Sequence, residues 1–387
     1  MIKLGSLFDG SGGFPLAGSL CGIEPKWAAE VEPYPIAVTR SRFPSMRHLG
    51  DISKVSGAEI EPVDIITFGS PCQDLSVAGK RAGLKHEANG DEETTRSGLF
   101  MEAVRIIKEM REATNGMYPT FALWENVHGA FSSNKGEDFR TVLEELIRIV
   151  EPSASVPPVP KAGWNYADCY VGDGWSLAYR VFDAQYWGVP QRRRRIHLVL
   201  DLRGERAREV LFEREGVRGY FAEGRTPWQE TAAHPQGSHA VAYATDVGFF
   251  NTQEEVSPTL LARGYKDPHL VTYPEGVVRY IVRRLTPTEC ARLQGFADRW
   301  GDIDEKTDFT DEEYRFWLGV RNTHAAINGK AVKEYTKAQM LTWYGKLHTD
   351  SAEYKMWGNG IALPPALYCM QGMTDVLNRE EADEWLT

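Results

Sequence analysis

The chain has 387 residues, and its 54 acidic side chains outnumber its 44 Lys and Arg, which gives a formal net charge of -10. This length allows two or three domains, and the acidic balance argues mildly against a polyanionic partner, because phosphate binding needs Lys and Arg. The five cysteines include no Cys-x-x-Cys pair, which argues against a zinc site or a dithiol redox centre. The start of the chain lacks the pattern of a signal peptide and no apolar run reaches membrane-spanning length, so we expect a reduced, soluble, cytoplasmic protein.

Up to about Leu200, apolar strand candidates alternate with helical patterns, which is typical of βαβ units and a parallel sheet. The expected elements are, in chain order, strand 3–8, helix 14–20, strand 27–30, helix 34–42, strand 64–69, helix 99–111, strand 121–124, helix 138–150 and strand 196–200. Past Asp201 the rhythm breaks, and the composition of 203–276 predicts a smaller domain of short strands and long loops. Thr286 and Thr310 each open a capping-box pattern, which predicts two further helix starts.

One cysteine stands at the end of the apolar strand 64–69, in Ser70-Pro71-Cys72-Gln73. In an open α/β sheet, ligands and chemistry lie just beyond the carboxyl ends of the strands, so Cys72 is a candidate nucleophile. On position alone, packing as a small hydrophobic side chain is the commoner role.

A glycine-rich turn, residues 8–13, joins the first strand to the first helix and would let the backbone approach a ligand closely. Glu30 ends the second strand, where an acid can accept hydrogen bonds from the ribose hydroxyls of an adenosine cofactor, and Asp51 could accept one from an adenine amino group. The alternative for each acid is a solvated loop carboxylate. The turn lacks Gly-Lys-Ser/Thr, which argues against a P-loop nucleotide hydrolase.

Glu125 follows the strand 121–124 and so emerges at the same edge of the sheet as Cys72, where a partly desolvated carboxyl can stay protonated and act as an acid. Residues alternate faces on a strand, so Arg193 and Arg195 are expected to face the site and Arg192 and Arg194 to face outward. A solvated basic edge is the alternative.

Taken in order, these motifs resemble those of the C5-cytosine DNA methyltransferases of bacteria and phages, over the whole chain except two segments. Leu7 to Phe14 is similar to the family's cofactor loop, and Ser70 to Gly79 to its nucleophile loop. The other matching motifs are Glu30-Val31, Gly50-Asp51-Ile52, Arg96 to Phe100, Glu125-Asn126-Val127, Gln191-x-Arg193-x-Arg195, Arg284 to Phe296 and Gly358 to Ile361. There are two departures: Ser6 and Asp9 stand where many members have an acid and a small residue, and Gly360-Ile361 replaces the more usual Ser-Val.

The resemblance implies a DNA (cytosine-5-)-methyltransferase with S-adenosylmethionine as cofactor. Cys72 would add to carbon 6 of a flipped cytosine, and Glu125 would hydrogen-bond ring nitrogen 3 and the exocyclic amine. Arg195 would hold the carbonyl oxygen, and Arg193 would support the phosphate or Glu125. The implied cofactor-binding residues are Phe8, Asp9, Gly10, Ser11, Gly12, Gly13, Glu30, Val31, Asp51, Ile52, Pro71, Leu99 and Asn359. The implied DNA-binding residues are Gln73, Ser76, Gln191, Thr259, Leu260, Arg263 and Lys266, and the last two could equally contact only phosphate.

The implied architecture is α/β: a doubly wound, Rossmann-like catalytic domain over 1–200, completed by 355–387, and a smaller, irregular β-rich target-recognition domain over 201–283. A supporting helical segment follows over 284–354, with an insertion at about 301–350 that either widens the DNA footprint or is a self-contained structural addition. We expect residues 73–96 to form a loop that closes over DNA. The partner would be double-stranded DNA, bound by a monomer at the nucleoid, and a cognate restriction endonuclease is left open.

Three other readings share parts of this pattern. A tRNA cytosine methyltransferase uses the same chemistry, although Leu75 to Gly79 resembles the DNA enzymes better. A DNA-binding repressor that carries a cofactor would need neither Cys72 nor Glu125. An NAD-dependent oxidoreductase would use the glycine turn but leaves Pro71-Cys72 and Glu125-Asn126 without a role.

Overall fold

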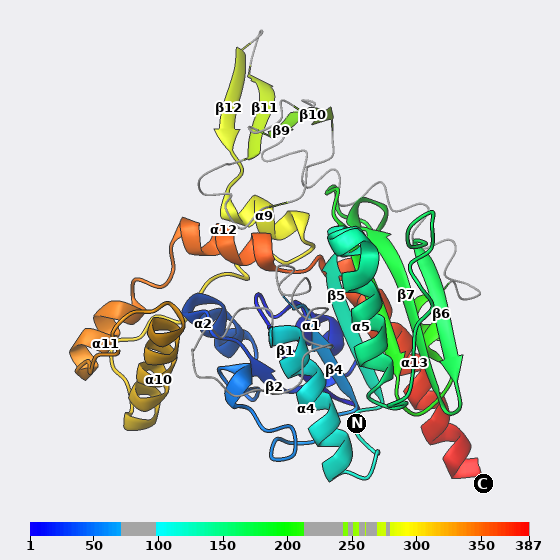
Figure 1. Ribbon diagram of the computed structural model, residues 1–387. Helices are drawn as coiled ribbons and strands as arrows, with labels where there is room; N and C mark the ends of the chain where they lie inside the picture. The colour runs from blue at the N-terminus through cyan, green and yellow to red at the C-terminus, as the bar shows by residue number, and fades with distance from the viewer. Residues whose placement is uncertain are drawn as a thin grey trace.

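The structure, a computed structural model, describes residues 1–70, 98–212, 243–246, 251–254, 260, 269–275 and 279–386. Its centre is an eight-stranded sheet with the strand order β3-β2-β1-β4-β5-β8-β7-β6 (Figure 1). The strands are β1 (Lys3–Leu7), β2 (Glu24–Ala29), β3 (Arg47–His48), β4 (Ile65–Phe68), β5 (Phe121–Val127), β6 (Ala167–Gly172), β7 (Trp175–Asp183) and β8 (Arg194–Asp201). Neighbours from β3 to β5 run parallel, which confirms the α/β class with a mostly parallel central sheet.

The far side of the sheet differs from the expected all-parallel pattern, because β8, β7 and β6 each run antiparallel to their neighbour. Strands β6 and β7 were not predicted. They form a hairpin in which Gly172 pairs with Trp175, so the turn is the two residues Asp173-Gly174, with Gly174 at φ 73°. Asp-Gly is the residue pair that two-residue hairpin turns favour, so the signal was present in the sequence. The edge strand β6 alternates exposed and half-exposed residues and lacks an apolar run, which explains why it was missed.

Alternating residues of the strands face two separate cores. Ile65, Leu123 and Val199 lie on one face, with α1 (Gly13–Leu20), α6 (Ala207–Leu211) and α13 (Leu363–Leu386). Ile66, Ala122 and Leu198 lie on the other face, under α4 (Leu99–Ala113) and α5 (Glu137–Ile147). This period of two along each buried strand explains why the strands read as continuous apolar runs.

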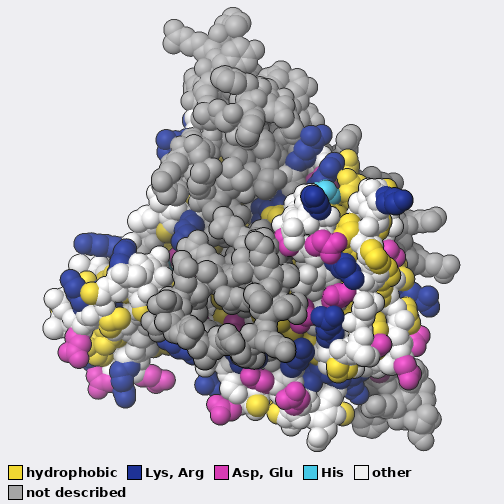
Figure 2. All heavy atoms as spheres, in the orientation of Figure 1, with side chains coloured by type: hydrophobic (Ala, Val, Ile, Leu, Met, Phe, Trp, Pro, Cys, Tyr) yellow, Lys and Arg dark blue, Asp and Glu magenta, His cyan; other side chains and the backbone are white. Residues whose placement is uncertain are grey.

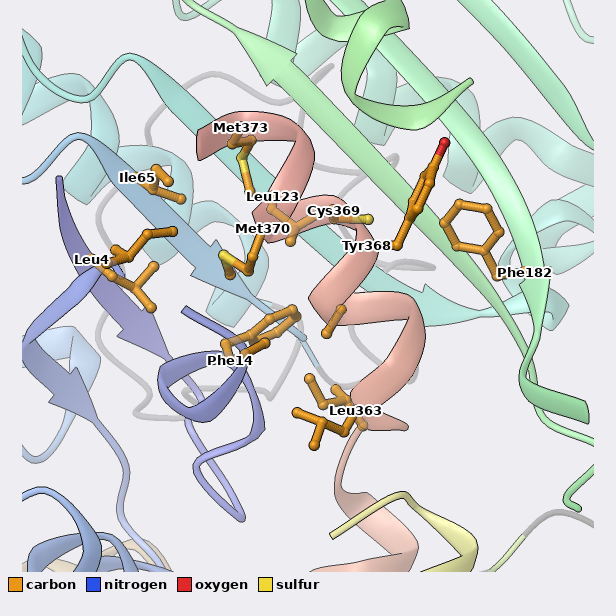
Figure 3. Packing of buried hydrophobic residues seen from close by; sticks show 14 of the residues in the cluster. Leu4, Phe14, Ile65, Leu123, Phe182, Leu363, Tyr368, Cys369, Met370 and Met373 are labelled. Carbon is orange, nitrogen blue, oxygen red and sulfur yellow. The ribbon is translucent and has the colours of Figure 1, made fainter. Parts of the chain in front are cut away.

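The C-terminal helix α13 packs directly against the first strand and the first helix. Figure 3 shows Met370 and Met373 of α13 near Leu4 of β1 and Ile65 of β4. Phe14, at the start of α1, lies in the same cluster. The end of the chain therefore fixes the segment in which the glycine-rich turn lies.

The remaining described helices gather on the α2 side of the sheet (Figure 1). They are α2 (Pro33–Arg42), α9 (Pro287–Leu293), α10 (Asp311–Ile327), α11 (Lys337–Tyr344) and α12 (Asp350–Asn359). The capping boxes predicted at Thr286 and Thr310 are both present and open α9 and α10. Within the segment 301–350, Trp317 of α10 and Met340 of α11 share a buried cluster with Ile36 of α2.

A second, antiparallel sheet with the order β10-β9-β11-β12 stands apart from the first, beyond α9 (Figure 1). Its strands are β9 (Tyr243–Asp246), β10 (Asn251–Glu254), β11 (His269–Glu275) and β12 (Arg279–Arg284). Three of these strands lie wholly or mostly in the segment 203–276, for which the composition predicts short strands. Among the described helices, none is both long and apolar enough to cross a membrane.

Candidate active site

Several of the predicted site residues that the structure describes lie at one edge of the central sheet. The parallel strands β1, β2, β4 and β5 deliver, at or just beyond their carboxyl ends, the glycine turn, Glu30, Ser70 and Glu125. Strand β8 runs the other way and begins at this edge, so Arg195 pairs with Val127 across the two strands. Glu125 lies inside β5, which runs three residues further than expected, to Val127.

The glycine turn is held in a conformation that few side chains tolerate. Phe8, Gly10 and Gly12 all have positive φ, at 56°, 56° and 76°. For an aromatic residue such as Phe8 this backbone costs on the order of 1–3 kcal/mol, and strain of that kind gathers at functional sites. The Asp9 amide donates to the Ala29 carbonyl at 3.2 Å, which ties the turn to the end of β2.

Glu30 closes the turn from the second strand. Its carboxylate accepts hydrogen bonds from the backbone N–H groups of Gly10, Val31 and Glu32, at 2.8, 2.7 and 2.9 Å. Burial raises the pKa of Glu30, and these three donors oppose that effect. These bonds fix the side chain beside the glycine turn. The expected neighbour Asp51 caps a short 3-10 helix, η1 (Ile52–Lys54), through Ser53, and Ile52 is buried.

Residues from the far end of the sequence complete the turn. The indole Nε1 of Trp300 donates to the Ser11 carbonyl at 2.8 Å. A Cβ on Gly13 would lie 2.5 Å from Cγ1 of Ile361, and one on Gly360 would lie 2.9 Å from Oγ of Ser11. Gly13 and Gly360 therefore permit a close approach of two chain segments. Trp300 was not singled out, and the motif that ends at Ile361 was noted without its contact to Gly13, since contacts across some 290 and 350 residues leave no local pattern in a single sequence.

The end of β4 is tied to β5 immediately before the candidate nucleophile. Asn126 donates from Nδ2 to the Ser70 carbonyl at 3.0 Å, and Trp124 donates from Nε1 to Ser70 Oγ at 3.2 Å. Cys72 stands two positions further along the sequence. It lies outside the described residues, together with Pro71, Gln73, Ser76, Thr259, Arg263, Lys266 and the whole of the predicted closing loop.

Glu125 is 8% exposed and forms an ion pair with Arg195, whose Nε lies 3.2 Å from Glu125 Oε1. The geometry is not that of a hydrogen bond, because Oε1 has no hydrogen-bond partner. Burial raises the pKa of Glu125, and the charges of Arg195 and Arg193 only partly offset this. The carboxyl is therefore easier to protonate than an ordinary glutamate and keeps an oxygen free for a further group.

The four arginines alternate as predicted. Arg194 has an exposed side chain that contacts Asp183 at 3.3 Å, and Arg192 is exposed, whereas Arg193 and Arg195 are largely buried. Arg193 donates from its guanidinium to the Gly360 carbonyl, which links β8 to the segment that closes the glycine turn.

Other predicted residues have different surroundings. Leu99 begins α4 and is half-buried, and Asn359 is the exposed last residue of α12. Gln191 is fully buried with both amide atoms unpartnered, and Leu260 is 6% exposed in the core beside α13, so neither presents a free surface to DNA in this conformation. Among the described residues, no group of three or more His, Cys, Asp or Glu could hold a metal ion.

The face of the described part that Figure 2 shows is not uniformly basic. Figure 2 shows Lys and Arg interspersed with Asp and Glu over the view of Figure 1. The positive charges that act on Glu125 come instead from Arg193, directly before β8, and from Arg195 in β8. Any polyanion would therefore meet local arginines rather than a general positive field.

Comparisons with known proteins agree with this arrangement. Residues 2–149 match the model of a family described as C-5 cytosine-specific DNA methylase. The chain is 26% identical, over 97% of its length, to a DNA N-6-adenine-methyltransferase of Escherichia phage P1, of which it spans 62%. It is 27% identical, over 93% of its length, to the type II methyltransferase M2.BsuMI of Bacillus subtilis (strain 168), of which it spans 82%.

Among solved structures, the fold is similar to that of the S. pombe Dnmt2 methyltransferase. The TM-score is 0.59, and the match covers 98% of this chain and 100% of that one at 14% sequence identity. A sequence identity of 14% shows similarity of the fold alone.

Proposed function

We propose that this chain, whose residues 2–149 match the model of the C-5 cytosine-specific DNA methylases, transfers a methyl group from S-adenosylmethionine to carbon 5 of cytosine in duplex DNA, through a covalent adduct of Cys72. The observation that carries this proposal is the meeting of Glu125, Arg195 and the nucleophile-bearing end of β4 at the same sheet edge as the glycine turn.

The described residues fit an adenosine cofactor with a charged amino-acid end. Glu30 is fixed beside the turn, where it would accept hydrogen bonds from the ribose hydroxyls, and Asp51 and Ile52 lie at the next strand end, where they would contact the adenine. Gly13 and Gly360 leave room for the close backbone approach around Ser11. Bound here, S-adenosylmethionine supplies an electrophilic methyl group.

In this proposal the protein activates the base. Carbon 5 of cytosine is a weak nucleophile, and the Cys72 thiolate makes it an enamine carbon by adding to carbon 6. Carbon 5 then takes the methyl group, loses its proton to solvent or a base, and the carbon–sulfur bond breaks to return Cys72 and release 5-methylcytosine. The target base must leave the duplex first, which costs a few kcal/mol.

Glu125 has the properties that the addition step needs. Protonated, its carboxyl can donate to ring nitrogen 3 of cytosine, and a raised pKa keeps that proton available. Arg195, 3.2 Å from the same carboxyl, can donate to the carbonyl oxygen of the base. Together they would favour cytosine over thymine, which carries a proton on nitrogen 3 and a second carbonyl in place of the amine.

The test is to express the protein in a host without cytosine methylation and to analyse the host DNA. Bisulfite sequencing should reveal 5-methylcytosine in one sequence context, and mass spectrometry of the digested nucleosides should find 5-methylcytosine and no N6-methyladenine. The search for N6-methyladenine is included because the phage P1 relative is named for adenine methylation. Methyl transfer to tRNA rather than duplex DNA, or to adenine alone, would contradict the proposal.

The matched variant is Cys72→Ser, which keeps the size of the side chain and removes the thiolate. We expect methyl transfer to fall by at least 10³-fold, since a serine hydroxyl is a far weaker nucleophile at neutral pH. Folding, and binding of S-adenosylhomocysteine measured by calorimetry, should be unchanged. Turnover of this variant at the level of the unmodified protein would overturn the covalent mechanism.

A further inference from the structure

The segment 301–350 is attached at both ends to one side chain of α2. The hydroxyl of Tyr34 donates to the Gly301 carbonyl at 2.7 Å, at the start of the segment. Near the end of the segment, the imidazole of His348 stacks on the Tyr34 ring, with the ring centroids 5.5 Å apart. Tyr34 is buried. Both ends of the segment therefore meet the first turn of α2.

Between these ends, the segment packs along the rest of α2 and reaches β3. The centroid of the Phe316 ring in α10 lies 4.1 Å from the guanidinium carbon of Arg40. The same ring meets the His48 ring of β3 edge-on, with centroids 6.3 Å apart. Trp317 of α10 shares its buried cluster with Ile36 of α2. The segment thus lies against α2 from the first turn of that helix to its last (Figure 1).

Glu32 connects this packing to Glu30. The backbone N–H groups of Val31 and Glu32 both donate to Oε1 of Glu30, at 2.7 and 2.9 Å. The side chain of Glu32 pairs with two cationic groups: its Oε1 lies 2.8 Å from Nζ of Lys355, and its Oε2 lies 3.6 Å from Nε2 of His324. One residue therefore holds the Glu30 carboxylate through its backbone and contacts the segment through its side chain.

The start of α2 leaves the Glu32 carboxylate available for these contacts. Glu32 is the N-cap residue of α2, yet its side chain forms no capping hydrogen bond. An acid at this position usually accepts from the N–H of the second or third helical residue. Here Pro33 and Pro35 are the first and third helical residues, and proline has no N–H. The two prolines reduce the need for a cap, so the carboxylate can pair with His324 and Lys355 instead.

The same pairing limits the effect of the Glu32 charge on Glu30. Burial raises the pKa of Glu30, and the neighbouring carboxylate of Glu32 adds to that effect. The cationic partners of Glu32 offset its charge, which favours the ionised form of Glu30. A hydroxyl donates a stronger hydrogen bond to an ionised carboxylate than to a neutral one.

We propose that the segment 301–350 positions Glu30 to accept hydrogen bonds from the ribose of the cofactor, and that Glu32 is the positioning residue between them. This inference rests on the proposed function, in which Glu30 binds the ribose hydroxyls. It adds to that site a set of residues that act on the ligand only through Glu30. The preference for a ribose over a deoxyribose then depends on contacts made by α10, including that of His324.

The experiment measures by calorimetry the affinities for two nucleosides that differ in one hydroxyl. 5′-Methylthioadenosine has the adenosine of the cofactor without the amino-acid end, and its 2′-deoxy analogue lacks the 2′ hydroxyl. The unmodified protein should prefer the ribose compound by about tenfold or more, the cost of losing a hydrogen bond to a charged group. In Glu32→Ala we expect binding of 5′-methylthioadenosine to weaken by about three- to thirtyfold, within the range for residues of one hydrogen-bond network. The 2′-deoxy analogue should weaken less, so the preference falls.

A double-mutant cycle separates positioning from general support of the fold. In a Glu30→Gln background, Glu32→Ala should change the affinity for 5′-methylthioadenosine by less than about twofold, because Glu32 acts through Glu30. His324→Ala, in the segment itself, should lower the ribose preference by part of the Glu32→Ala effect and add nothing to that variant. Glu312→Ala removes an exposed acid of α10 and is the matched control, which should leave both affinities unchanged.

Equal weakening of both nucleosides in Glu32→Ala, or additive effects of Glu32→Ala and Glu30→Gln, would overturn the inference and assign Glu32 to general support. If circular dichroism shows that Glu32→Ala does not fold, His324→Ala gives the answer, and an unchanged ribose preference in that variant would overturn the inference. Binding of both nucleosides by the unmodified protein without a preference would also overturn it. If the unmodified protein binds neither nucleoside, the proposed cofactor site itself fails, and the inference fails with it.

Discussion

Arg195 and Arg194 are adjacent arginines with opposite surroundings. The Arg195 side chain is 13% exposed and lies against Glu125, whereas that of Arg194 is 58% exposed and contacts Asp183. Strand geometry alone causes the difference, because successive side chains leave a strand on opposite faces. Substitution of Arg195 therefore tests its proposed role, and the same substitution of Arg194 is a control one residue away.

We expect Arg195→Ala to lower kcat for methyl transfer by about 10²- to 10³-fold, the usual cost of removing one donor to a developing charge. Arg194→Ala should lower kcat less than about threefold. Arg195 also lowers the pKa of Glu125, so its removal should raise that pKa further. If the protonated Glu125 is the active form, activity falls as the pH rises through its pKa, and in Arg195→Ala this fall should move to higher pH. Single-turnover rates between pH 6 and 9 test the shift, and an equal loss in both variants would contradict it.

Several single residues could be placed from the sequence because each sits beside a strand end. Glu30, Glu125 and the alternation of Arg192 to Arg195 follow from strand position and the period of two. The Ser6–Asp9 hydrogen bond could not be foreseen, although both residues stood out as departures, because their pairing depends on the left-handed backbone at Phe8 between them.

At the scale of elements, the contact between the start of α1 and the segment after α12 decides whether the glycine turn keeps its shape. Gly13 has ordinary helical backbone, so it is required for space and not for its φ angle. A methyl group there would overlap Ile361, and overpacking in a dense interior costs on the order of 1–3 kcal/mol.

We therefore expect Gly13→Ala to weaken binding of both S-adenosylhomocysteine and 5′-methylthioadenosine by about tenfold or more, and a second substitution, Ile361→Ala, to restore part of the affinity. Gly319→Ala is the matched control in another helix. Its Cβ would meet open space in α10, so it should stabilise the protein by about 0.5–1 kcal/mol through helix propensity alone. Calorimetry measures the ligand affinities, and denaturant unfolding measures the free energy of unfolding. Unchanged affinity in Gly13→Ala would show that the glycine turn tolerates displacement of its backbone and would contradict this prediction.

Elements with a local signal were predictable, and those fixed by distant partners were not. The capping boxes at Thr286 and Thr310 each mark the start of a helix by a pattern of four consecutive residues. In contrast, β6 is an edge strand with polar residues, and its place in the sheet depends on pairing with β7 rather than on its own apolar pattern. The antiparallel direction of β8 likewise follows from the hairpins that precede it.

At the scale of the whole molecule, one carboxylate joins the central sheet domain to the segment 301–350. Glu32, at the start of α2, forms ion pairs with His324 of α10 at 3.6 Å and with Lys355 of α12 at 2.8 Å. Burial alone would raise the pKa of Glu32, but His324 and Lys355 together lower it to about 2. The backbone N–H of Glu32 also donates to Glu30, so this junction adjoins the proposed cofactor site.

A carboxyl with a lowered folded-state pKa stabilises the protein above its unfolded pKa and loses that effect as the pH falls. For Glu32 the window runs from about pH 4.5 down to about pH 2. Glu32→Gln should destabilise the protein at pH 7 by about 1 kcal/mol, a figure reduced for the third of the side chain that is exposed. The stability difference from the unmodified protein should shrink as the pH falls through this window. Denaturant unfolding at pH 7 and at pH 3 measures it, and a constant difference would rule out Glu32 as the titrating group.

The position of α13 has a consequence for the order of events during synthesis. The glycine turn precedes Trp300, Ile361 and the α13 side chains that brace it by hundreds of residues, so it is synthesised well before them. A nascent chain therefore lacks these partners of the turn until translation has passed α13. Messages with a premature stop before α13 would yield protein in which the proposed cofactor site is incomplete.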